Sequence, residues 1–209
     1  MTIQEDPSKS KKGRSKSEEK RFQIMAAASE LFLEQGYENC SMEAIAKLAG
    51  VSKQTLYSHF GGKEQLFSDA VEATCQQYRI WDNLDASANC YDYLEAFCIS
   101  FAELLVSREA LGVMRVCAAE GGRSDVAELF WQAGPVKMRA KLKEFLSEQQ
   151  RQGQLHFADV DTAASQLIAM LHGQTHTRLL LGLDSSYDPK QLSRYAISCA
   201  QLFYKAHQD

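Results

Sequence analysis

Hydrophobic side chains recur every three or four positions along most of the chain, which is the spacing of amphipathic α-helices. In the first periodic stretch, from 17 to 34, the residues that share one face are Ile24, Ala28, Leu31 and Phe32. Gly36 follows this stretch as a C-terminal cap, and few prolines interrupt the pattern further along. The pattern therefore predicts an all-α protein of about nine helices.

Two short helices are predicted next, over residues 42–49 and 53–60. Ser41 and Ser52 stand directly before them, where a side-chain hydroxyl can accept a hydrogen bond from a free backbone N–H group. The break between the two helices is short and begins with Gly50. Two such helices joined by a tight turn form a helix-turn-helix, whose second helix can lie in the major groove of DNA.

The inner and outer faces of these two helices follow from the same pattern. Ile45 and Leu48 are expected to face inward from the first helix. Val51 and Leu56 have the spacing of a hydrophobic staple, and Phe60 completes the inner face of the second helix. The outward positions of the second helix, all able to form hydrogen bonds, are Lys53, Gln54, Thr55, Tyr57, Ser58 and His59.

The chemistry of these outward side chains predicts which groups of the DNA each one contacts. Residues near the start of a recognition helix contact base edges, so Lys53 and Gln54 are expected to read bases, Lys suiting guanine and Gln suiting adenine. Thr55 and Tyr57 are expected to touch a thymine methyl group or a phosphate. The residues expected over the sugar-phosphate backbone, which position the protein without reading sequence, are Ser58, His59 and Lys63.

Charge is distributed unevenly around a formal net charge of -4. Residues 1–63 carry ten Lys and Arg against eight Asp and Glu, whereas residues 64–209 carry 13 against 19. Residues 1–16 are basic and rich in serine, and we expect a flexible arm that can follow a phosphate backbone, with a solubilising tail as the alternative. The expected organisation is this arm, a DNA-binding head over 17–63 and a helical body over 64–209.

Three motifs together resemble the DNA-binding signature of the TetR family of bacterial regulators. They are Ser-Met-Glu-Ala-Ile-Ala at 41–46, Gly-Val-Ser-Lys-Gln-Thr-Leu-Tyr-Ser-His-Phe at 50–60 and Lys-Glu-Gln-Leu-Phe at 63–67. The resemblance implies base contacts by Lys53, Gln54 and Tyr57. It implies phosphate contacts by Ser41, Thr55, His59 and Lys63. Gly62 departs from the pattern, where Ser or Asn is common, so we expect a weaker cap on the next helix.

Segments of the body are similar to the AefR-like subset of TetR regulators, namely 107–111 with Glu120, 130–135 and 179–183. Such bodies enclose a cavity for a small molecule, and aromatic and Met side chains suit an adaptable apolar pocket. Plain core packing is the alternative for each candidate. The candidate ligand-binding residues are Trp81, Phe97, Phe101, Met114, Cys117, Trp131, Met138, Met170, His172 and His176.

Metal and thiol chemistry receive less support from the sequence. His172 and His176 are four positions apart on a predicted helix, which lets two imidazoles share a metal, but no acidic or Cys partner lies nearby in sequence. We therefore expect a pocket wall or core and no metal site or cofactor. The six cysteines show no CxxC pairing and are expected to be reduced thiols, with Cys98 and Cys117 as candidates if the protein senses oxidants.

Two long helices are predicted to close the chain, over 159–181 and 189–207, and both carry apolar residues on more than one face. Faces that one small body cannot bury invite a partner. By resemblance, these helices pair with their twofold mates in a homodimer. That arrangement sets two recognition helices about one DNA turn, roughly 34–36 Å, apart.

The combined hypothesis is a repressor that leaves a pseudo-palindromic operator when a small apolar or amphipathic ligand binds its body. No GxSxG, HExxH or Gly-rich phosphate loop supports an enzyme, and no apolar stretch approaches the roughly 20 residues of a membrane span, so a cytoplasmic regulator is expected. The alternatives are a thiol-based redox-sensing repressor of the same fold and a DNA protein without sequence preference.

Overall fold

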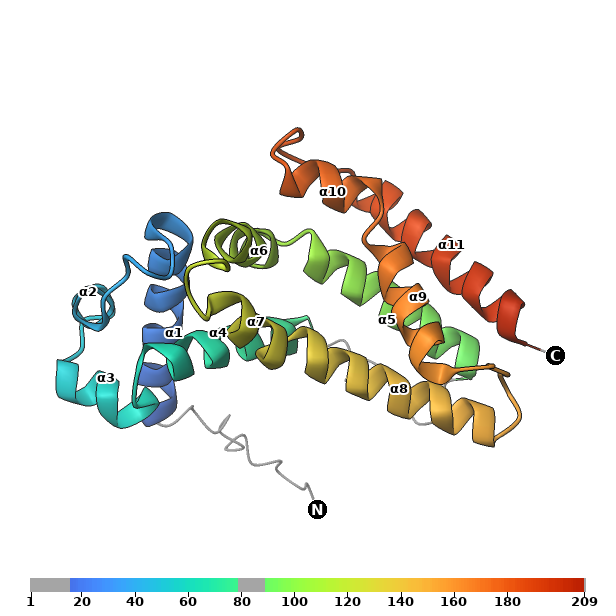
Figure 1. The fold of residues 1–209 in the computed structure, drawn as a ribbon, viewed down its shortest axis with the longest axis horizontal. Coiled ribbons are helices and arrows are strands. Elements are labelled where there is room, and N and C mark those ends of the chain that lie inside the picture. The colour runs from blue at the N-terminus through green and yellow to red at the C-terminus, as the bar shows by residue number, and fades with distance from the viewer. Residues whose placement is uncertain (1–15, 79–88, 209) are drawn as a thin grey trace, which may run out of the picture.

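The computed structural model describes residues 16–78 and 89–208. Within these ranges the chain is helical throughout, with no strand, which confirms the all-α prediction. None of the helices in these ranges is both long and apolar enough to cross a bilayer. The helices are α1 (Lys16–Gln35), α2 (Met42–Leu48), α3 (Lys53–Phe60), α4 (Lys63–Gln77), α5 (Cys90–Leu105), α6 (Arg108–Glu120), α7 (Val126–Ala133), α8 (Pro135–Arg151), α9 (Val160–Leu171), α10 (Gln174–Leu180) and α11 (Pro189–His207) (Figure 1).

The described helices form two hydrophobic clusters rather than one core. The first, which we call the head cluster, joins buried residues of α1 to α4 with Val116 of α6 and Val126 and Ala133 of α7. The second, the body cluster, is built from α5, α8, α9, α10 and α11 together with Leu111 of α6. In Figure 1 the elements α1 to α4 lie at one end of the molecule and α11 at the other, with α6 and α7 between them. The head cluster thus continues into helices that follow α5 in the chain.

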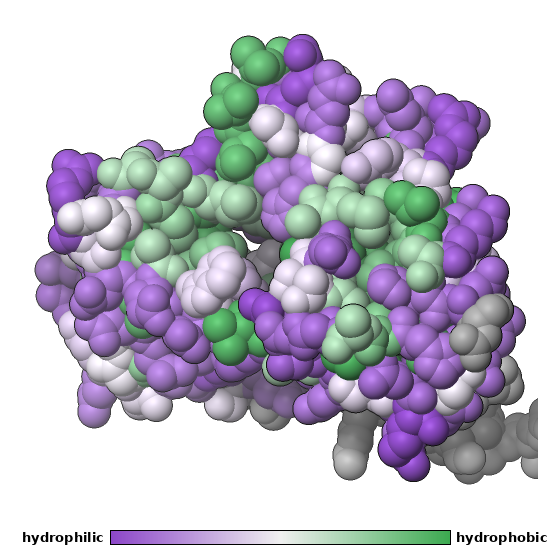
Figure 2. All heavy atoms as spheres, turned by 45° about the vertical axis from the view of Figure 1, so that its right-hand side comes forward, coloured by the Kyte–Doolittle hydropathy of each residue, from purple (hydrophilic) through white to green (hydrophobic). Residues whose placement is uncertain are grey.

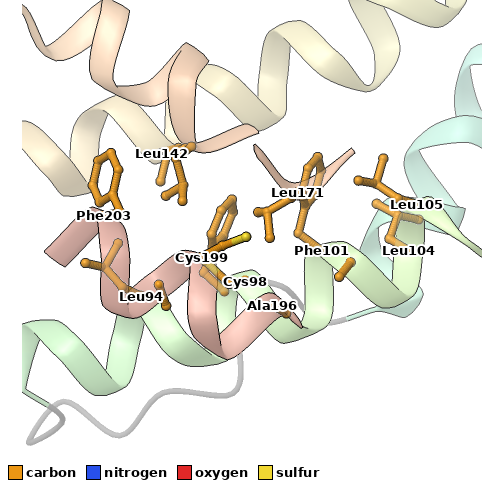
Figure 3. Packing of buried hydrophobic residues seen from close by; sticks show 14 of the residues in the cluster. Leu94, Cys98, Phe101, Leu104, Leu105, Leu142, Leu171, Ala196, Cys199 and Phe203 are labelled. Carbon is orange, nitrogen blue, oxygen red and sulfur yellow. The ribbon is translucent and has the colours of Figure 1, made fainter. Parts of the chain in front are cut away.

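The body cluster is centred on α5, which packs along α11. In Figure 3, Leu94 and Cys98 of α5 lie near Phe203 and Cys199 of α11, while Phe101 of α5 lies beside Leu171, and all of these residues are buried. Leu142 of α8 and Leu171 of α9 complete the cluster from the other side in the same figure. This packing gives the body a rigid frame, since close-packed interiors deform little.

The helix-turn-helix has the predicted caps. The Ser41 hydroxyl oxygen accepts a hydrogen bond from the Ala44 N–H group at 3.1 Å, and the Ser52 hydroxyl oxygen accepts one from the Thr55 N–H group at 3.0 Å. Each bond satisfies one N–H group left free at a helix start. Gly62, as expected, provides no side-chain cap for α4.

One inward position on α2 was predicted wrongly. Ile45 is fully buried, but the Leu48 side chain is 48% exposed. The buried residues of this seven-residue helix are Ile45 and Ala46, and Leu48 lies about 200° around the helix from Ala46. In so short a helix the periodic pattern has too few positions to fix the centre of the buried face.

The predicted helix over 159–181 is in fact two helices, and this break partly explains why eleven helices are found in the described residues where about nine were expected. α9 ends at Leu171 and α10 begins at Gln174. Gly173 lies against the Tyr195 ring, whose atoms are 2.7–2.8 Å from the place a Cβ would take. The Tyr195 hydroxyl donates at 2.7 Å to the Met170 carbonyl, which also accepts the Gly173 N–H group at 3.3 Å where α9 ends.

The turn after α1 gives a stability prediction. Gly36 has a φ of +83°, and a Cβ at this position would overlap the Glu120 carboxylate, whose other oxygen accepts the Glu38 N–H group at 2.9 Å. Gly61 has a similar φ of +69° but lies in open space. We expect Gly61→Ala to lower the free energy of unfolding by about 1–2 kcal/mol through backbone strain alone. Gly36→Ala should cost about 1 kcal/mol more, because the Glu120 hydrogen bond is lost as well.

Urea denaturation of both variants, alone and with Glu120→Ala, measures this difference. The extra cost of Gly36→Ala should disappear once the Glu120 carboxylate is absent. Equal losses for the two glycine variants in the parent background would show that Glu120 does not hold this turn.

Candidate nucleic-acid interface and ligand cavity

The α3 helix presents a polar face to solvent at one end of the molecule (Figure 1). Lys53, Gln54, Tyr57 and Ser58 are exposed, the Tyr57 side chain at 49%. Their inward counterpart, Leu56, is completely buried in the head cluster. The structure therefore brings the predicted base-reading side chains together on a single outward face.

Lys53 is paired within the free protein. Its ammonium lies 2.8 Å from a carboxylate oxygen of Glu43 on α2, and both side chains are well exposed. The hydrogen bond and charge of Lys53 hold the pKa of the Glu43 carboxyl below its usual value. Because exposed ion pairs are weak in water, a DNA phosphate or a guanine edge can replace Glu43 as the partner of Lys53.

The hydroxyl groups near α3 also make local bonds. Thr55 and Ser52 hydroxyls lie 2.8 Å apart, and the Ser58 hydroxyl donates to the Thr55 carbonyl at 2.8 Å. The Ser41 hydroxyl accepts from the backbone and keeps its own proton free for a phosphate oxygen. Of the predicted phosphate contacts on serines, Ser41 is therefore better prepared to donate than Ser58.

Two predicted phosphate contacts have other neighbours in the free protein. The Lys63 ammonium donates to the Tyr37 carbonyl at 2.9 Å and to the Glu38 carbonyl at 3.4 Å, and it lies 4.3 Å from the centre of the Tyr37 ring. Lys63 thus ties the start of α4 to the turn after α1. The His59 ring is half-buried beside Phe60, with the ring centroids 6.1 Å apart.

Arg21 orients the recognition helix, a role that the sequence did not reveal. Its guanidinium lies 4.6 Å from the Phe60 ring centre, donates to the His59 carbonyl at 3.4 Å and pairs with Asp69 of α4 at 2.5 Å. It therefore connects α1 to the end of α3 and to α4. Since Arg21 stands in a run of basic residues, its sequence position suggested only a charged surface.

A cavity of about 1270 Å³ lies between the head and body clusters. Its wall combines Val71 and Phe130 from the head side with Leu104 and Leu105 from α5. Figure 2 shows hydrophobic residues on both sides of a hollow near the middle of the molecule. Five of the predicted ligand-binding residues line this cavity: Phe101, Met114, Trp131, Met138 and His172.

Of the other predicted ligand residues, Trp81 lies outside the described residues, and the remaining four do not line the cavity. Phe97 is completely buried in the body cluster, where it stacks on Phe101 at 5.6 Å. The Cys117 thiol points at the Val126 carbonyl, 3.8 Å away, and Met170 packs against the body cluster. His176 is buried behind His172. Helical periodicity predicts that these residues have apolar surroundings. It does not distinguish residues packed inside a hydrophobic cluster from residues that line a cavity between two clusters.

The cavity wall also carries charged residues that the sequence did not single out. Three basic side chains of α8 are already paired with acids: Arg139 and Lys143 share Asp161 of α9, and Arg151 pairs with Glu148 at 2.6 Å. The wall residues that carry a carboxylate are Glu109, Glu144, Glu148 and Asp161. The cavity is therefore amphipathic rather than purely apolar.

The two histidines of this region are close but differ in setting. Their ring centroids are 4.9 Å apart. His172 Nδ1 donates to the Ile168 carbonyl at 2.9 Å, whereas neither His176 nitrogen has a hydrogen-bond partner among the described residues. Burial lowers the pKa of His176, so this ring is neutral at neutral pH. The described residues contain no group of three or more His, Cys, Asp or Glu placed to hold a metal ion.

Burial also governs the candidate redox thiols. It raises the pKa of Cys117 to about 11, and it raises the pKa of Cys98, which is completely buried, well above the usual range. Cys75, which lines the cavity, has its pKa raised by burial too. Because the thiolate is the reactive form, none of these thiols is prepared to react at neutral pH.

The chain matches two protein families along most of its length. Residues 24–70 match the bacterial regulatory proteins of the tetR family, and residues 92–209 match the C-terminal domain of AefR-like transcriptional repressors. The second match alone covers more than half of the chain.

Solved structures share the whole fold. A putative TetR-family regulator from Mesorhizobium loti MAFF303099 is 26% identical, with a TM-score of 0.75 over 94% of this chain and 100% of that one. The Flavonoid-responsive Regulator FrrA is 33% identical, with a TM-score of 0.71 over 91% of this chain and 98% of that one.

Curated relatives are also transcriptional regulators. The Bacillus subtilis regulator YdeS is 27% identical over 86% of this chain and 87% of its own length. The activator FasR of Mycolicibacterium smegmatis is 48% identical, but this match spans only 24% of this chain and 23% of FasR. These proteins are regulators rather than enzymes, and the chain is a member of the TetR family of DNA-binding transcriptional regulators, with an AefR-like C-terminal domain.

Proposed function

We propose that the protein is a homodimeric repressor that binds a pseudo-palindromic operator through α3 and leaves it when a small aromatic ligand enters the cavity. The observation that carries this proposal is the joint presence of an exposed, hydrogen-bonding α3 face and a large amphipathic cavity between head and body. The similarity to AefR-like repressors supports repression rather than activation.

Base reading falls to Lys53, Gln54 and Tyr57 in this proposal, because they are exposed on the outward face of α3. Phosphate contacts fall to Ser41, Thr55, Ser58, His59 and Lys63. Residues 1–16, of which only Lys16, the first residue of α1, is described, remain the proposed basic arm, with residues 17–63 as the DNA-binding domain and 64–209 as the sensing and dimerising domain.

The double variant Gln54→Ala with Tyr57→Ala tests the reading face. We expect it to lose about 1–3 kcal/mol of operator binding for each base contact removed, while its affinity for random duplex changes little. Fluorescence anisotropy with the DNA that flanks the protein's own gene, titrated with salt, measures both affinities. Gln77→Ala, an exposed glutamine at the far end of α4, is the control. Unchanged operator affinity and selectivity in a folded double variant would exclude α3 as the reader.

The proposed dimer interface is formed by α10 and α11. Leu202 and Tyr195 are seven positions apart on α11, and so share a face, with side chains 62% and 41% exposed. Leu181 and Leu183, which follow α10, are 68% and 62% exposed. Figure 2 shows hydrophobic residues gathered at the top of the molecule, where α10 ends. An exposed apolar surface of this kind supports burial against a second copy of the chain.

Leu202→Arg should convert the dimer into monomers, because burying an unpaired charge in an interface that excludes water has a large desolvation cost. Size-exclusion chromatography with light scattering gives the mass directly. Leu48→Arg, which changes an exposed leucine at the opposite end of the molecule, should leave the dimer intact. A Leu202→Arg protein that remains dimeric at micromolar concentration would place the interface elsewhere.

Ligand control is supported by the position of α6. Its residues Val113 and Met114 line the cavity, while Glu120 at its end bonds the turn after α1 in the head. Solved FrrA, named as flavonoid-responsive, supports an aromatic ligand for this chain. A ligand that binds more tightly when α6 is in one position shifts the equilibrium between two positions of the head. The size of this shift equals the difference in binding free energy, typically ~1–3 kcal/mol.

The redox-sensing alternative predicts loss of DNA binding under mild peroxide. Because burial raises the pKa of Cys117 to about 11, its thiol stays protonated at pH 7, and its thiolate becomes abundant only as the pH approaches that value. We therefore expect operator binding at pH 7 to survive mild peroxide. Gel shift before and after treatment, with mass spectrometry of the thiols, measures this. The redox sensor would be favoured by two results together. Reductant would have to restore the operator binding that peroxide abolishes, and Cys117→Ser or Cys98→Ser would have to make operator binding resistant to peroxide.

A further inference from the structure

Glu109 places a carboxylate on the cavity wall without a partner. It lies in the first turn of α6, is half-buried and also borders a small apolar pocket formed with Phe32 and Phe67 of the head. Among the described residues it makes no hydrogen bond and no ion pair. A half-buried carboxylate is costly to leave unpaired, so this position favours a ligand that donates a hydrogen bond.

His172 provides a second acceptor on the same wall. Its Nδ1–H group donates to the Ile168 carbonyl, and in the tautomer that carries its proton there Nε2 is the acceptor. Nε2 accepts no hydrogen bond from a described residue and, unlike the two nitrogens of His176, is not buried. The ring meets Phe101 edge to face, with centroids 6.3 Å apart, so His172 adjoins an aromatic wall residue.

The same cavity is lined by several aromatic and methionine side chains. Phe130 and Trp131 of α7 and Met114 and Met138 of α6 and α8 line the cavity together with Phe101. Aromatic and thioether side chains pack well against the face of an aromatic ring. Planar aromatic molecules therefore fit the apolar part of this wall.

Charge on the wall selects among aromatic ligands. A ligand carboxylate near α6 would face Glu109 and Glu144; on α8, Arg151 pairs with Glu148, and Arg139 and Lys143 share Asp161, with the buried Arg139 Nε left without a partner among the described residues. A lipophilic cation would suit Glu109, but it offers no donor to His172 Nε2 unless it carries an N–H or O–H group. A neutral aromatic molecule with two phenolic hydroxyls offers one donor to each acceptor and brings no net charge into the cavity.

We propose that the cavity takes a planar aromatic molecule with at least two hydroxyl groups, which donate hydrogen bonds to the Glu109 carboxylate and to His172 Nε2. This inference rests on the proposed ligand-controlled function and specifies its ligand class. Glu109 and His172 are then the residues that determine specificity, and the aromatic side chains supply most of the contact area.

Isothermal titration calorimetry of the full-length protein tests the ligand class. The probes are apigenin, a trihydroxyflavone, its fully methylated ether, the cation tetraphenylphosphonium and the acid decanoate. We expect apigenin to bind at least about tenfold more tightly than its methyl ether, because methylation removes the donors and leaves both acceptors unpaired. Quenching of Trp131 fluorescence in a Trp81→Phe protein, which keeps one of the two tryptophans, shows that the probe occupies the cavity.

Variants then test the two acceptors. Glu109→Met and His172→Phe should each weaken apigenin binding about tenfold and leave the methyl ether almost unaffected. His172→Gln, which keeps an acceptor oxygen, should recover part of the loss. Glu103→Met, which removes an exposed glutamate of α5 that does not line the cavity, is the control.

Equal binding of apigenin and its ether, or an unchanged apigenin affinity in both variants, would overturn the assignment of the acceptors. Binding of tetraphenylphosphonium or decanoate alone would overturn the ligand class. Operator binding of the same proteins is measured separately. Intact operator binding without any apigenin binding would refute this inference alone, whereas loss of operator recognition in the parent protein would refute the proposed function.

Discussion

Burial of α6 and α7 against the head is the constraint on which the rest of the molecule depends. Both helices follow α5 in the chain, yet Val116, Val126 and Ala133 pack with residues of α1 to α4. Gly112 lies so close to Leu33 of α1 that a Cβ there would overlap the leucine side chain. The body therefore cannot move as a unit independent of the head, and a cavity is left where the two hydrophobic clusters meet.

A short series of polar contacts extends from this junction to the recognition helix. Glu120 of α6 bonds the turn after α1, and Lys63 of α4 bonds the carbonyls of the same turn. Arg21 joins α1 to the end of α3 and to Asp69 of α4. Each contact is modest in energy, but together they give α3 one orientation relative to α6. In the proposed mechanism, this is how a ligand beside α6 changes the angle or spacing of α3.

Local signals in the sequence predicted the helix starts and the buried side of α3 in the head, although not the exposure of Leu48 or the contacts of Arg21. Ser41 and Ser52 specify their caps through contacts within three residues, and Leu56 specifies the buried side of α3. The body depended on distant contacts that periodicity cannot show. The break between α9 and α10 follows from Tyr195 packing on Gly173, more than 20 positions earlier, and the unpaired state of Glu109 depends on which helices surround it. For the same reason only five of the nine predicted ligand residues that the structure describes lie on the cavity wall.

Coupling between the cavity and α3 is the central claim, and one titration measures it directly. Labelled DNA flanking the protein's own gene is held at a concentration near its dissociation constant, and apigenin is added while anisotropy and Trp131 fluorescence are recorded together. The account predicts a saturable release of DNA that follows the same binding curve as the fluorescence change, with a coupling of ~1–3 kcal/mol. Full occupancy of the cavity with DNA still bound at its original affinity would contradict it.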